Sequence, residues 1–318
     1  MPGIGTSGYL PEGGWQSYIG VRYQFSDRHF RGSEEEPERQ EQGTQVENTV
    51  YLYDLGLTYG LSARTSLSLS LPFLFATRSG VNRDFGERYE DTANGIGDLT
   101  LTARRWMLDP EENDDQNVSL GFGIKLPTGE PNAVDSRKVL DDNGETVYQV
   151  RTVDQSIQPG DGGFGFLVDL SAFTQVGQFT PYLAGTYLFN PRGTNGVDTQ
   201  RSRASEAIMS VADQYVARVG TMWTAEGSHF SFGIGGRVEG VPVYDVFGSS
   251  DGFRRPGYAI SVEPSLIYAN AKSVFSLSVP VALERNRERS VPDRETPGRH
   301  GDAAFADWVL LLGWTYRF

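Results

Sequence analysis

The chain has 318 residues, no cysteine, and a formal net charge of −13 from 28 basic and 41 acidic side chains. Such an acidic chain is a poor partner for nucleic acid, and it contains no disulfide, thiolate metal site or cysteine nucleophile. It also lacks any run of about 18 apolar residues, which excludes a transmembrane helix. The segment Met1-Pro2-Gly3 lacks the basic and apolar regions of an export signal, so we expect this sequence to be a mature, processed form.

Alternation of apolar and polar residues predicts about twelve β-strands, because a period of two places one residue set on each face of a strand. In residues 66–75, for example, Leu67 and Leu69 share one face and Ser66 and Ser68 share the other. No segment has a sustained helical period. The predicted strands are, in chain order, 15–25, 48–60, 65–76, 95–106, 117–126, 162–174, 179–189, 213–224, 229–238, 258–269, 273–283 and 305–318.

The connections between these segments alternate strictly between long and short. This pattern is typical of an up-and-down outer-membrane barrel with short periplasmic turns and long external loops, and an even strand number places both termini in the periplasm. We therefore predict an all-β transmembrane barrel as a single domain over residues 1–318. The long connections are 26–47, 77–94, 127–161, 190–212, 239–257 and 284–304; the short ones are 61–64, 107–116, 175–178, 225–228 and 270–272.

Two segments are candidates to narrow the barrel. Asn143-Gly144 is a hairpin signal inside the longest loop, so this loop is expected either to project as a ribbon or to fold inward. The N-terminal segment 1–14 is the second candidate. Twelve strands lie between eight, which side chains fill, and sixteen, which leave an open channel, so the width is compatible with a narrow pore.

The size of the apolar set distinguishes a membrane barrel from a soluble one. About five large apolar residues on each of twelve strands would overfill a lumen, whereas the opposite set is rich in Gly, Ser and Thr and suits a wet interior. Aromatic residues also lie toward strand ends, as in the girdles of membrane barrels. These aromatics are Tyr51, Tyr59, Phe73, Phe75, Tyr187, Phe189, Tyr215, Trp223, Tyr258 and Tyr268.

The chain ends on an aromatic strand in which every second residue is large and apolar. This strand resembles the C-terminal signal that the barrel-assembly machinery reads in bacterial outer-membrane proteins. A soluble protein with such an exposed edge would risk aggregation. The residues of this predicted signal are Trp308, Leu310, Leu312, Trp314, Tyr316 and Phe318.

Prolines inside predicted strands remove a hydrogen-bond donor from the sheet, and we expect Pro72, Pro181, Pro264 and Pro280 near rims or at bulges. If the apolar set faces lipid, strand parity predicts a lumen set with six acidic and six basic residues. Such a balance disfavours a strongly ion-selective pore, and the charges either cross-link strands or line a solute path. They are Arg22, Asp54, Asp98, Arg104, Lys125, Asp169, Arg218, Arg237, Glu239, Glu263, Glu284 and Arg317.

Four larger side chains also fall on the inward set, where they either pack inside the barrel or line a path for an apolar or aromatic solute. They are Tyr18, Phe173, Tyr182 and Met222. For catalysis the chain offers only three histidines. His29 and His300 lie in long loops and His229 at a short turn, and none is expected beside a serine at the lipid interface. No phosphate loop, zinc pattern or dinucleotide motif is present.

Residues 95–105, GIGDLTLTARR, and the later Leu126-Pro127-Thr128-Gly129 resemble outer-membrane proteins grouped with the meta-pathway of phenol degradation. The segment SLPF at 70–73 is shared as well, and the resemblance is strongest over about residues 48–190. It implies a barrel and, by association, uptake of small, often hydrophobic or aromatic compounds. It supplies no catalytic residues.

We therefore expect an outer-membrane channel for passive uptake of small solutes, without enzymatic activity or cofactor. Its expected partners are membrane lipid and lipopolysaccharide, the barrel-assembly machinery and a small-molecule solute, with no nucleic acid; the oligomeric state is left open. One alternative is a non-conducting barrel that displays its surface loops to a partner. Another is an outer-membrane hydrolase that uses His29 or His300.

Overall fold

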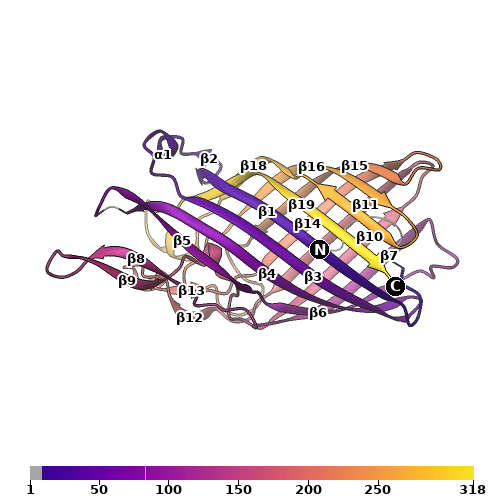
Figure 1. Ribbon diagram of the computed structural model, residues 1–318, viewed down its shortest axis with the longest axis horizontal. Helices are drawn as coiled ribbons and strands as arrows, with labels where there is room; N and C mark the ends of the chain where they lie inside the picture. Colours follow the sequence, from indigo (N-terminus) through magenta and orange to yellow (C-terminus); the bar gives the residue numbers. More distant parts are fainter. Residues whose placement is uncertain (1–8, 83) are drawn as a thin grey trace.

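The computed structural model describes residues 9–82 and 84–318 and contains one antiparallel sheet that closes into a barrel. Closure occurs where β1 (Trp15–Arg31) pairs with β19 (Ala303–Arg317), from Gln16 opposite Arg317 to Phe30 opposite Ala303. Because the sheet closes, the strands of the wall have both edges paired, as hydrocarbon surroundings require. The strands run obliquely around a long cylinder, with the C-terminus at one opening and the long loops at the other (Figure 1).

The barrel has twelve wall positions, and neighbours in the sequence are neighbours in the wall. After β1 the wall continues through β3 (Glu47–Ser62), β4 (Thr65–Asn82), β5 (Glu87–Ile96) with β6 (Leu99–Trp106), β7 (Gln116–Leu126), β10 (Gly165–Thr174), β11 (Phe179–Phe189), β14 (Gln214–Thr224), β15 (Phe230–Val241), β16 (Gly257–Ala269), β17 (Ser273–Ser278) with β18 (Val281–Arg287), and β19.

All twelve predicted strands are confirmed, but several are longer than predicted at the long-loop end. The sheet between β4 and β5 continues to Asn82 opposite Glu87, so most of the predicted loop 77–94 is a paired hairpin. Beyond the apolar band both faces of a strand can be polar, and alternation then gives no signal while the backbone pairing continues.

Prolines coincide with the two divided wall positions. Pro72 on β4 lies beside the break between β5 and β6, where Gly97 N donates to Pro72 O at 2.7 Å. Pro264 and Pro280 lie at the break between β17 and β18, where Val279 N donates to Pro264 O at 3.1 Å. Since proline has no N–H to donate, each break takes the place of regular pairing. Pro181 instead pairs within β11, close to the short-turn end.

The outer face of the barrel is apolar. Leu67 is 44% exposed and Leu312 is 42% exposed, on strands whose alternate residues face the interior. This orientation is the one expected of a transmembrane barrel and is opposite to that of a soluble barrel with a dry centre. No helix in the described part of the chain is long and apolar enough to cross a membrane.

The long-loop end carries the remaining elements. A hairpin of β8 (Val134–Leu140) and β9 (Thr146–Thr152) projects from this end (Figure 1). The other elements there are β2 (Glu34–Glu35), α1 (Glu38–Glu41), the 3₁₀ turns η1 (Gln155–Ile157) and η2 (Ala204–Glu206), the strand pair β12 (Thr194–Asp198) and β13 (Ile208–Ser210), and α2 (Val291–Glu295).

Candidate functional site

A cavity of about 970 Å³ occupies the barrel interior. Small-molecule sites in proteins measure about 300–1,000 Å³, so the cavity is large enough for a small organic solute. Its wall combines charged side chains with aliphatic and aromatic ones, because inward-facing positions from many strands contribute to it. Among the residues that line it are Tyr18, Arg22, Leu52, Asp54, Tyr182, Leu188, Val216, Arg237 and Glu239.

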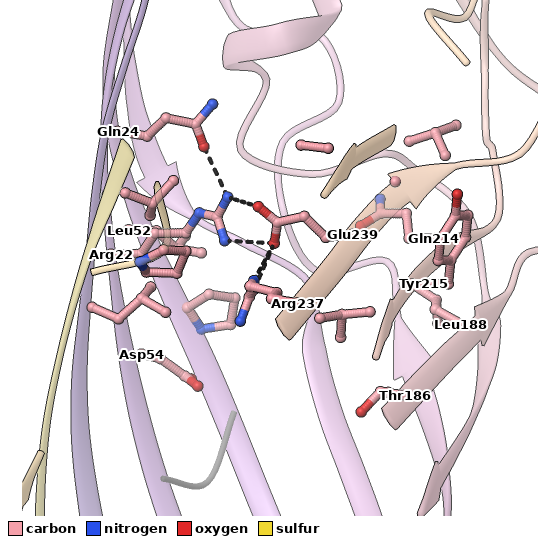
Figure 2. Close-up of a pocket in the computed structure, with 18 of the residues that line it drawn as sticks. Arg22, Gln24, Leu52, Asp54, Thr186, Leu188, Gln214, Tyr215, Arg237 and Glu239 are labelled. Atoms are coloured by element: carbon pink, nitrogen blue, oxygen red, sulfur yellow. Dashed lines mark hydrogen bonds and ion pairs between the residues drawn. The ribbon is translucent and has the colours of Figure 1, made fainter. Parts of the chain in front are cut away.

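An ion pair crosses this cavity from one wall to another. Arg22 on β1 donates to both carboxylate oxygens of Glu239 on β15, at 3.1 and 2.8 Å. In the barrel wall these strands are separated by β19, β17 with β18, and β16, so the pair is not a contact between neighbouring strands. We call the pair the bar; in Figure 2 its two side chains approach each other from opposite ribbons. Gln24 accepts a further hydrogen bond from Arg22 at 2.9 Å.

The bar is anchored in a more deeply buried ion network. Arg237 donates to Glu239 at 2.5 Å and lies 3.8 Å from Glu263. Glu263 is 1% exposed and also accepts two hydrogen bonds from Arg218. Charges this far from water must be paired to be tolerated, and here two carboxylates and three guanidinium groups satisfy one another.

Other lumen charges are paired in the same manner. Arg104 pairs with Asp169, which also accepts a hydrogen bond from Thr186 Oγ1 at 3.2 Å. Lys125 lies between Asp98 and Asp161, with the Asp98 carboxylate 3.6 Å away. The described lumen charges thus form cross-links between strands and loops and leave no strongly charged wall along the cavity.

The other three predicted lumen residues lie in three different surroundings. Asp54 lines the cavity and accepts a hydrogen bond from Ser70. Arg317 lies at the short-turn end, where its Nε donates to Gln16 Oε1 at 3.4 Å. Glu284 does not face the lumen: a bulge opposite Ile260 and Ser261 shifts the register, and Glu284 pairs with the outward-facing Ile260. Strict alternation through residues 273–283 could not reveal this reversal.

Three of the four larger inward side chains line the cavity, namely Tyr18, Tyr182 and Met222. Tyr182 and Met222 pack with Ile267 into a small buried cluster, against which Phe173 also packs. Gly220 on the adjacent strand β14 and Gly235 on β15 lie beside the Tyr182 ring, and a Cβ at either position would lie 2.7 Å from the Tyr182 hydroxyl oxygen. Glycines on two neighbouring strands therefore make room for an aromatic ring on a third.

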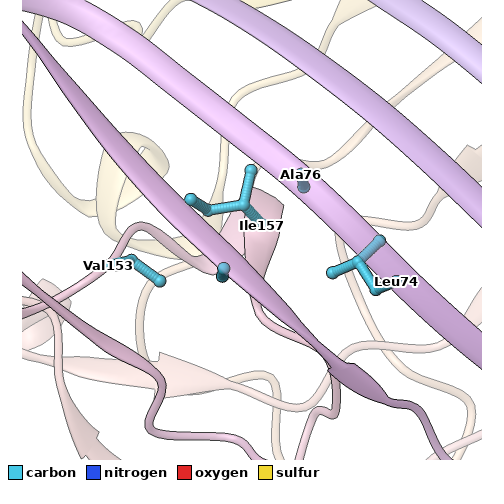
Figure 3. Packing of buried hydrophobic residues seen from close by; sticks show 5 residues of the cluster. Leu74, Ala76, Val153 and Ile157 are labelled. Atoms are coloured by element: carbon cyan, nitrogen blue, oxygen red, sulfur yellow. The ribbon is translucent and has the colours of Figure 1, made fainter.

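A segment of the longest loop closes part of the long-loop end. Residues 153–161, which we call the lid, fold into the barrel mouth, where Val153 is 1% exposed and Ile157 is fully buried. Both side chains pack against inward-facing positions of β4 and β5 (Figure 3), which are Leu74, Ala76 and Ala93. The longest loop therefore does both things expected of it: its β8–β9 hairpin projects while the lid folds inward.

Ion pairs hold the lid across the mouth. Arg255 donates to both carboxylate oxygens of Asp154 at 2.8 and 2.7 Å, and Arg78 on β4 lies 3.6 Å from the same carboxylate. Burial raises the pKa of the Asp154 carboxyl, but these two guanidinium groups outweigh burial and hold that pKa well below its ordinary value. The lid is thus tied to both sides of the opening.

A second set of contacts, which we call the latch, connects the lid to the neighbouring loops through Ser210, Arg254 and Asp245. Gln155 Nε2 donates to the backbone oxygen of Ser210 at 2.6 Å. The Ser210 hydroxyl accepts from Arg254, which also donates to both carboxylate oxygens of Asp245, at 2.7 and 2.6 Å. The Arg254 and Asp245 side chains are 1% and 0% exposed.

At the opposite end, residues 9–14, which we call the strap, turn back from β1 into the barrel. Gly13 N donates to Gly60 O on β3, and Gly60 N donates to Gly14 O, each at 2.9 Å. Tyr9 contacts the rings of Trp106 and Phe173, with centroid distances of 5.0 and 6.4 Å. The part of the predicted N-terminal constriction at residues 1–8 lies outside the described residues.

The histidines take part in structural contacts. His29 is 4% exposed, its Nδ1 lies 2.7 Å from Asp302 Oδ2, and its Nε2 accepts from Val46 N at 2.8 Å. His300 Nε2 lies 2.6 Å from the backbone oxygen of Arg287. No group of three or more His, Asp or Glu among residues 9–82 and 84–318 is placed to hold a metal ion.

The C-terminal aromatic residues are on the outer face. Trp308, Trp314 and Phe318 are 45%, 39% and 71% exposed. Recognition of this strand by the barrel-assembly machinery stays a prediction. The lid and its partners, by contrast, were not anticipated individually: Asp154, Arg254 and Arg255 lie in irregular loops, where no period relates one residue to another. The hairpin signal at 143–144 was the one available indication that this loop is structured.

Comparison with known proteins supports the fold. A family model described as the MetA pathway of phenol degradation matches residues 2–139. A crystal structure of an outer membrane channel from Pseudomonas putida F1 superposes with a TM-score of 0.63 at 14% identity, covering 100% of this chain and 99% of the other. The toluene transporter TbuX of Ralstonia pickettii gives 0.51 at 10% identity, covering 97% and 90%. No curated protein sequence matches the chain.

Proposed function

We propose that this chain, a twelve-stranded barrel that resembles the MetA-pathway family, is a channel of the bacterial outer membrane for small, largely apolar or aromatic solutes. The observation that carries the proposal is the cavity of about 970 Å³, which lies inside a closed wall and is crossed by a single bar. A passage for solutes needs interior volume, and a barrel that served only as a scaffold would be expected to fill it with side chains.

The chemistry of the cavity supports an uncharged solute. The charges that line it are paired with one another or hydrogen-bonded, as in the pairs of Arg22 with Glu239 and of Lys125 with Asp161 and in the contact of Asp54 with Ser70. An ion entering the cavity would compete with these pairs, whereas a neutral solute can pass beside them along Tyr18, Leu52 and Leu188. TbuX is a toluene transporter, and passage of a small aromatic compound is consistent with this surface.

The paired charges and the lid also favour a second candidate, which is a non-conducting barrel that displays its loops. In that case the lid would stay closed and the bar would serve only to cross-link β1 and β15. The two candidates differ in whether removing the bar changes permeation.

The test replaces both members of the bar, Arg22→Ala with Glu239→Ala, so that neither charge of the pair is left behind. Purified protein is measured in planar bilayers, and uptake of a radiolabelled neutral aromatic compound is measured in cells that lack their own porins. We expect single-channel events in the unmodified protein and larger ones in the double variant. The matched control replaces Arg28 and Glu35, an ion pair that does not line the cavity, and should leave conductance unchanged.

Absence of channel events and of uptake in both the unmodified protein and the double variant would contradict the channel and leave the displayed-loop barrel. Equal conductance in the two proteins would show that the solute path does not pass the bar.

A further inference from the structure

The loop between β15 and β16 carries large apolar side chains that point away from the protein. Tyr244, Val246 and Phe247 are 57%, 57% and 55% exposed. Between them lies Asp245, whose side chain is fully buried. The Asp245 carboxylate is therefore turned inward to Arg254, while the side chains before and after it are turned outward.

This apolar segment is continuous with the apolar surface of the wall. The Phe247 ring lies 5.5 Å from Phe189, the last residue of β11, and Phe189 lies 4.4 Å from Tyr187 on the same strand. Phe189 is aligned with Phe166 of β10, which is 46% exposed on the outer face. Phe247 therefore extends the row of aromatic side chains formed by Phe166 and Phe189, which lie at the long-loop ends of β10 and β11.

The backbone of the loop is fixed in this position, because both sides of the exposed segment are anchored. Val246 N donates to Asp213 Oδ2 and Asp213 N donates to Asp245 Oδ1, each at 2.9 Å. A Cβ on Gly248 would lie 2.1 Å from Pro191 O, which shows how closely this loop packs against the start of the loop that follows β11. The exposure of Val246 and Phe247 therefore belongs to a held loop and is not the result of a loose one.

We propose that residues 244–247 form a lipid-contact surface that lies in the boundary between headgroups and acyl chains of the outer leaflet. Lipid is the occupant that the position favours: the segment continues an outward-facing aromatic row of the wall, and aromatic rings prefer this boundary. A patch facing water would leave Val246 and Phe247 hydrated, next to Tyr244, whose ring lies 5.5 Å from the Arg294 guanidinium.

The same segment joins the leaflet to the lid. Asp245 holds Arg254, Arg254 holds the Ser210 hydroxyl, and the backbone oxygen of Ser210 accepts from Gln155 of the lid. A loop held in the leaflet would fix the outer end of this series of contacts. The proposal does not depend on what the channel carries, because it concerns the outer rim alone.

Site-directed spin labelling tests the lipid contact directly, because the chain has no cysteine of its own. A nitroxide is attached at Val246→Cys in protein reconstituted into phospholipid vesicles, and its collisions with oxygen and with a water-soluble nickel complex are compared. The lipid reference is Phe232→Cys on the outer face of β15, and the water reference is Tyr148→Cys on the projecting hairpin, where the native residues are 55% and 76% exposed.

We expect the ratio of oxygen to nickel collisions at position 246 to approach that at position 232 and to exceed that at position 148 several-fold. Phe247→Cys provides a second position and should behave alike. A ratio at both positions equal to that of the hairpin would overturn the proposal, because it would place the segment in water. Protection from both reagents would also overturn it, because a second copy of the protein would then be the occupant.

Discussion

The two ends of the barrel are narrowed by different chemistry. At the long-loop end the lid is held by ion pairs, in which Asp154 binds Arg255 and Asp245 binds Arg254. At the short-turn end the strap is held by aromatic contacts of Tyr9 and by backbone hydrogen bonds to Gly60. Removing one charge at the lid therefore leaves its buried partner unsatisfied. Removing one contact at the strap leaves the other contacts in place.

This difference makes the two ends separable by substitution. Hydrogen–deuterium exchange of the protein in lipid reads both at once, through the backbone amides of residues 153–161 for the lid and 9–14 for the strap. Both segments contain ordered amides: Val153 N donates to Ala133 O at 3.0 Å, and Gly13 N donates to Gly60 O at 2.9 Å.

The largest effect is expected from Asp245→Ala. The change leaves Arg254, which is 1% exposed, without its carboxylate partner, and breaking a buried ion pair on one side costs about 3–5 kcal/mol. Exchange should rise sharply in residues 242–256 and, through Ser210, in the lid, while the strap stays protected. Asp251→Ala in the same loop is the matched control, since Asp251 is exposed. Equal effects of the two substitutions would contradict the latch.

Asp154→Ala should have the next largest effect and should act on the lid alone. Arg255 and Arg78 lose their shared carboxylate. The side chains of Asp154, Arg255 and Arg78 are 15%, 20% and 11% exposed, so water replaces part of the lost interaction. A charged hydrogen-bond partner in such surroundings contributes about 2 kcal/mol. Faster exchange of residues 153–161, with larger channel events, would agree. Asp142→Ala at the exposed tip of the hairpin is the control and should change neither.

Tyr9→Ala should produce a smaller change, confined to the strap. It removes the edge-to-face contact with Trp106 and the hydroxyl contacts with Asn113 O and Asn117 Nδ2, at 3.1 and 2.8 Å. An aromatic pair contributes about 1 kcal/mol beyond burial. Tyr9→Phe keeps the ring and should have a weaker effect. If exchange in the lid also rose, the two ends would not be independent.

A change of pH should have the smallest effect. Two carboxylates at the long-loop end, Asp154 and Asp302, have pKa values held below the ordinary value, by Arg255 and Arg78 in the first case and by His29 and Arg39 in the second, despite burial. Each contributes stability above the ordinary pKa of about 3.9 and loses it only as the pH falls through its lowered value. Lid exchange corrected for intrinsic rate should therefore be constant between about pH 7.5 and pH 5. A loosening of the lid within that range would contradict the assignment of the Asp154 ion pairs.

The sequence predicted the wall well because the wall obeys a local rule. Alternation located all twelve strands, and parity placed Arg22, Lys125 and Glu239 inside without knowledge of their partners. The rule failed where the backbone departs from it: the bulge beside Leu283 turned Glu284 outward, and Pro280 divided a strand that alternation had joined.

The lid could not be predicted in the same way. The pair of Asp154 with Arg255 joins residues 101 positions apart, in segments without period. The bar joins residues 217 positions apart on strands that are not neighbours. Parity states that a side chain points inward, but which side chains meet depends on the circumference and tilt of the closed barrel.

The pairing of β1 with β19 sets a condition on biogenesis. Because β1 pairs with β19, a nascent chain that still lacks β19 has an unpaired edge on β1 and another on the most recently made strand. Such a chain cannot satisfy its backbone in hydrocarbon, so insertion before β19 has been made would be unfavourable and the exposed edges would favour aggregation. We therefore expect the strand edges of this topology to need protection between synthesis and closure.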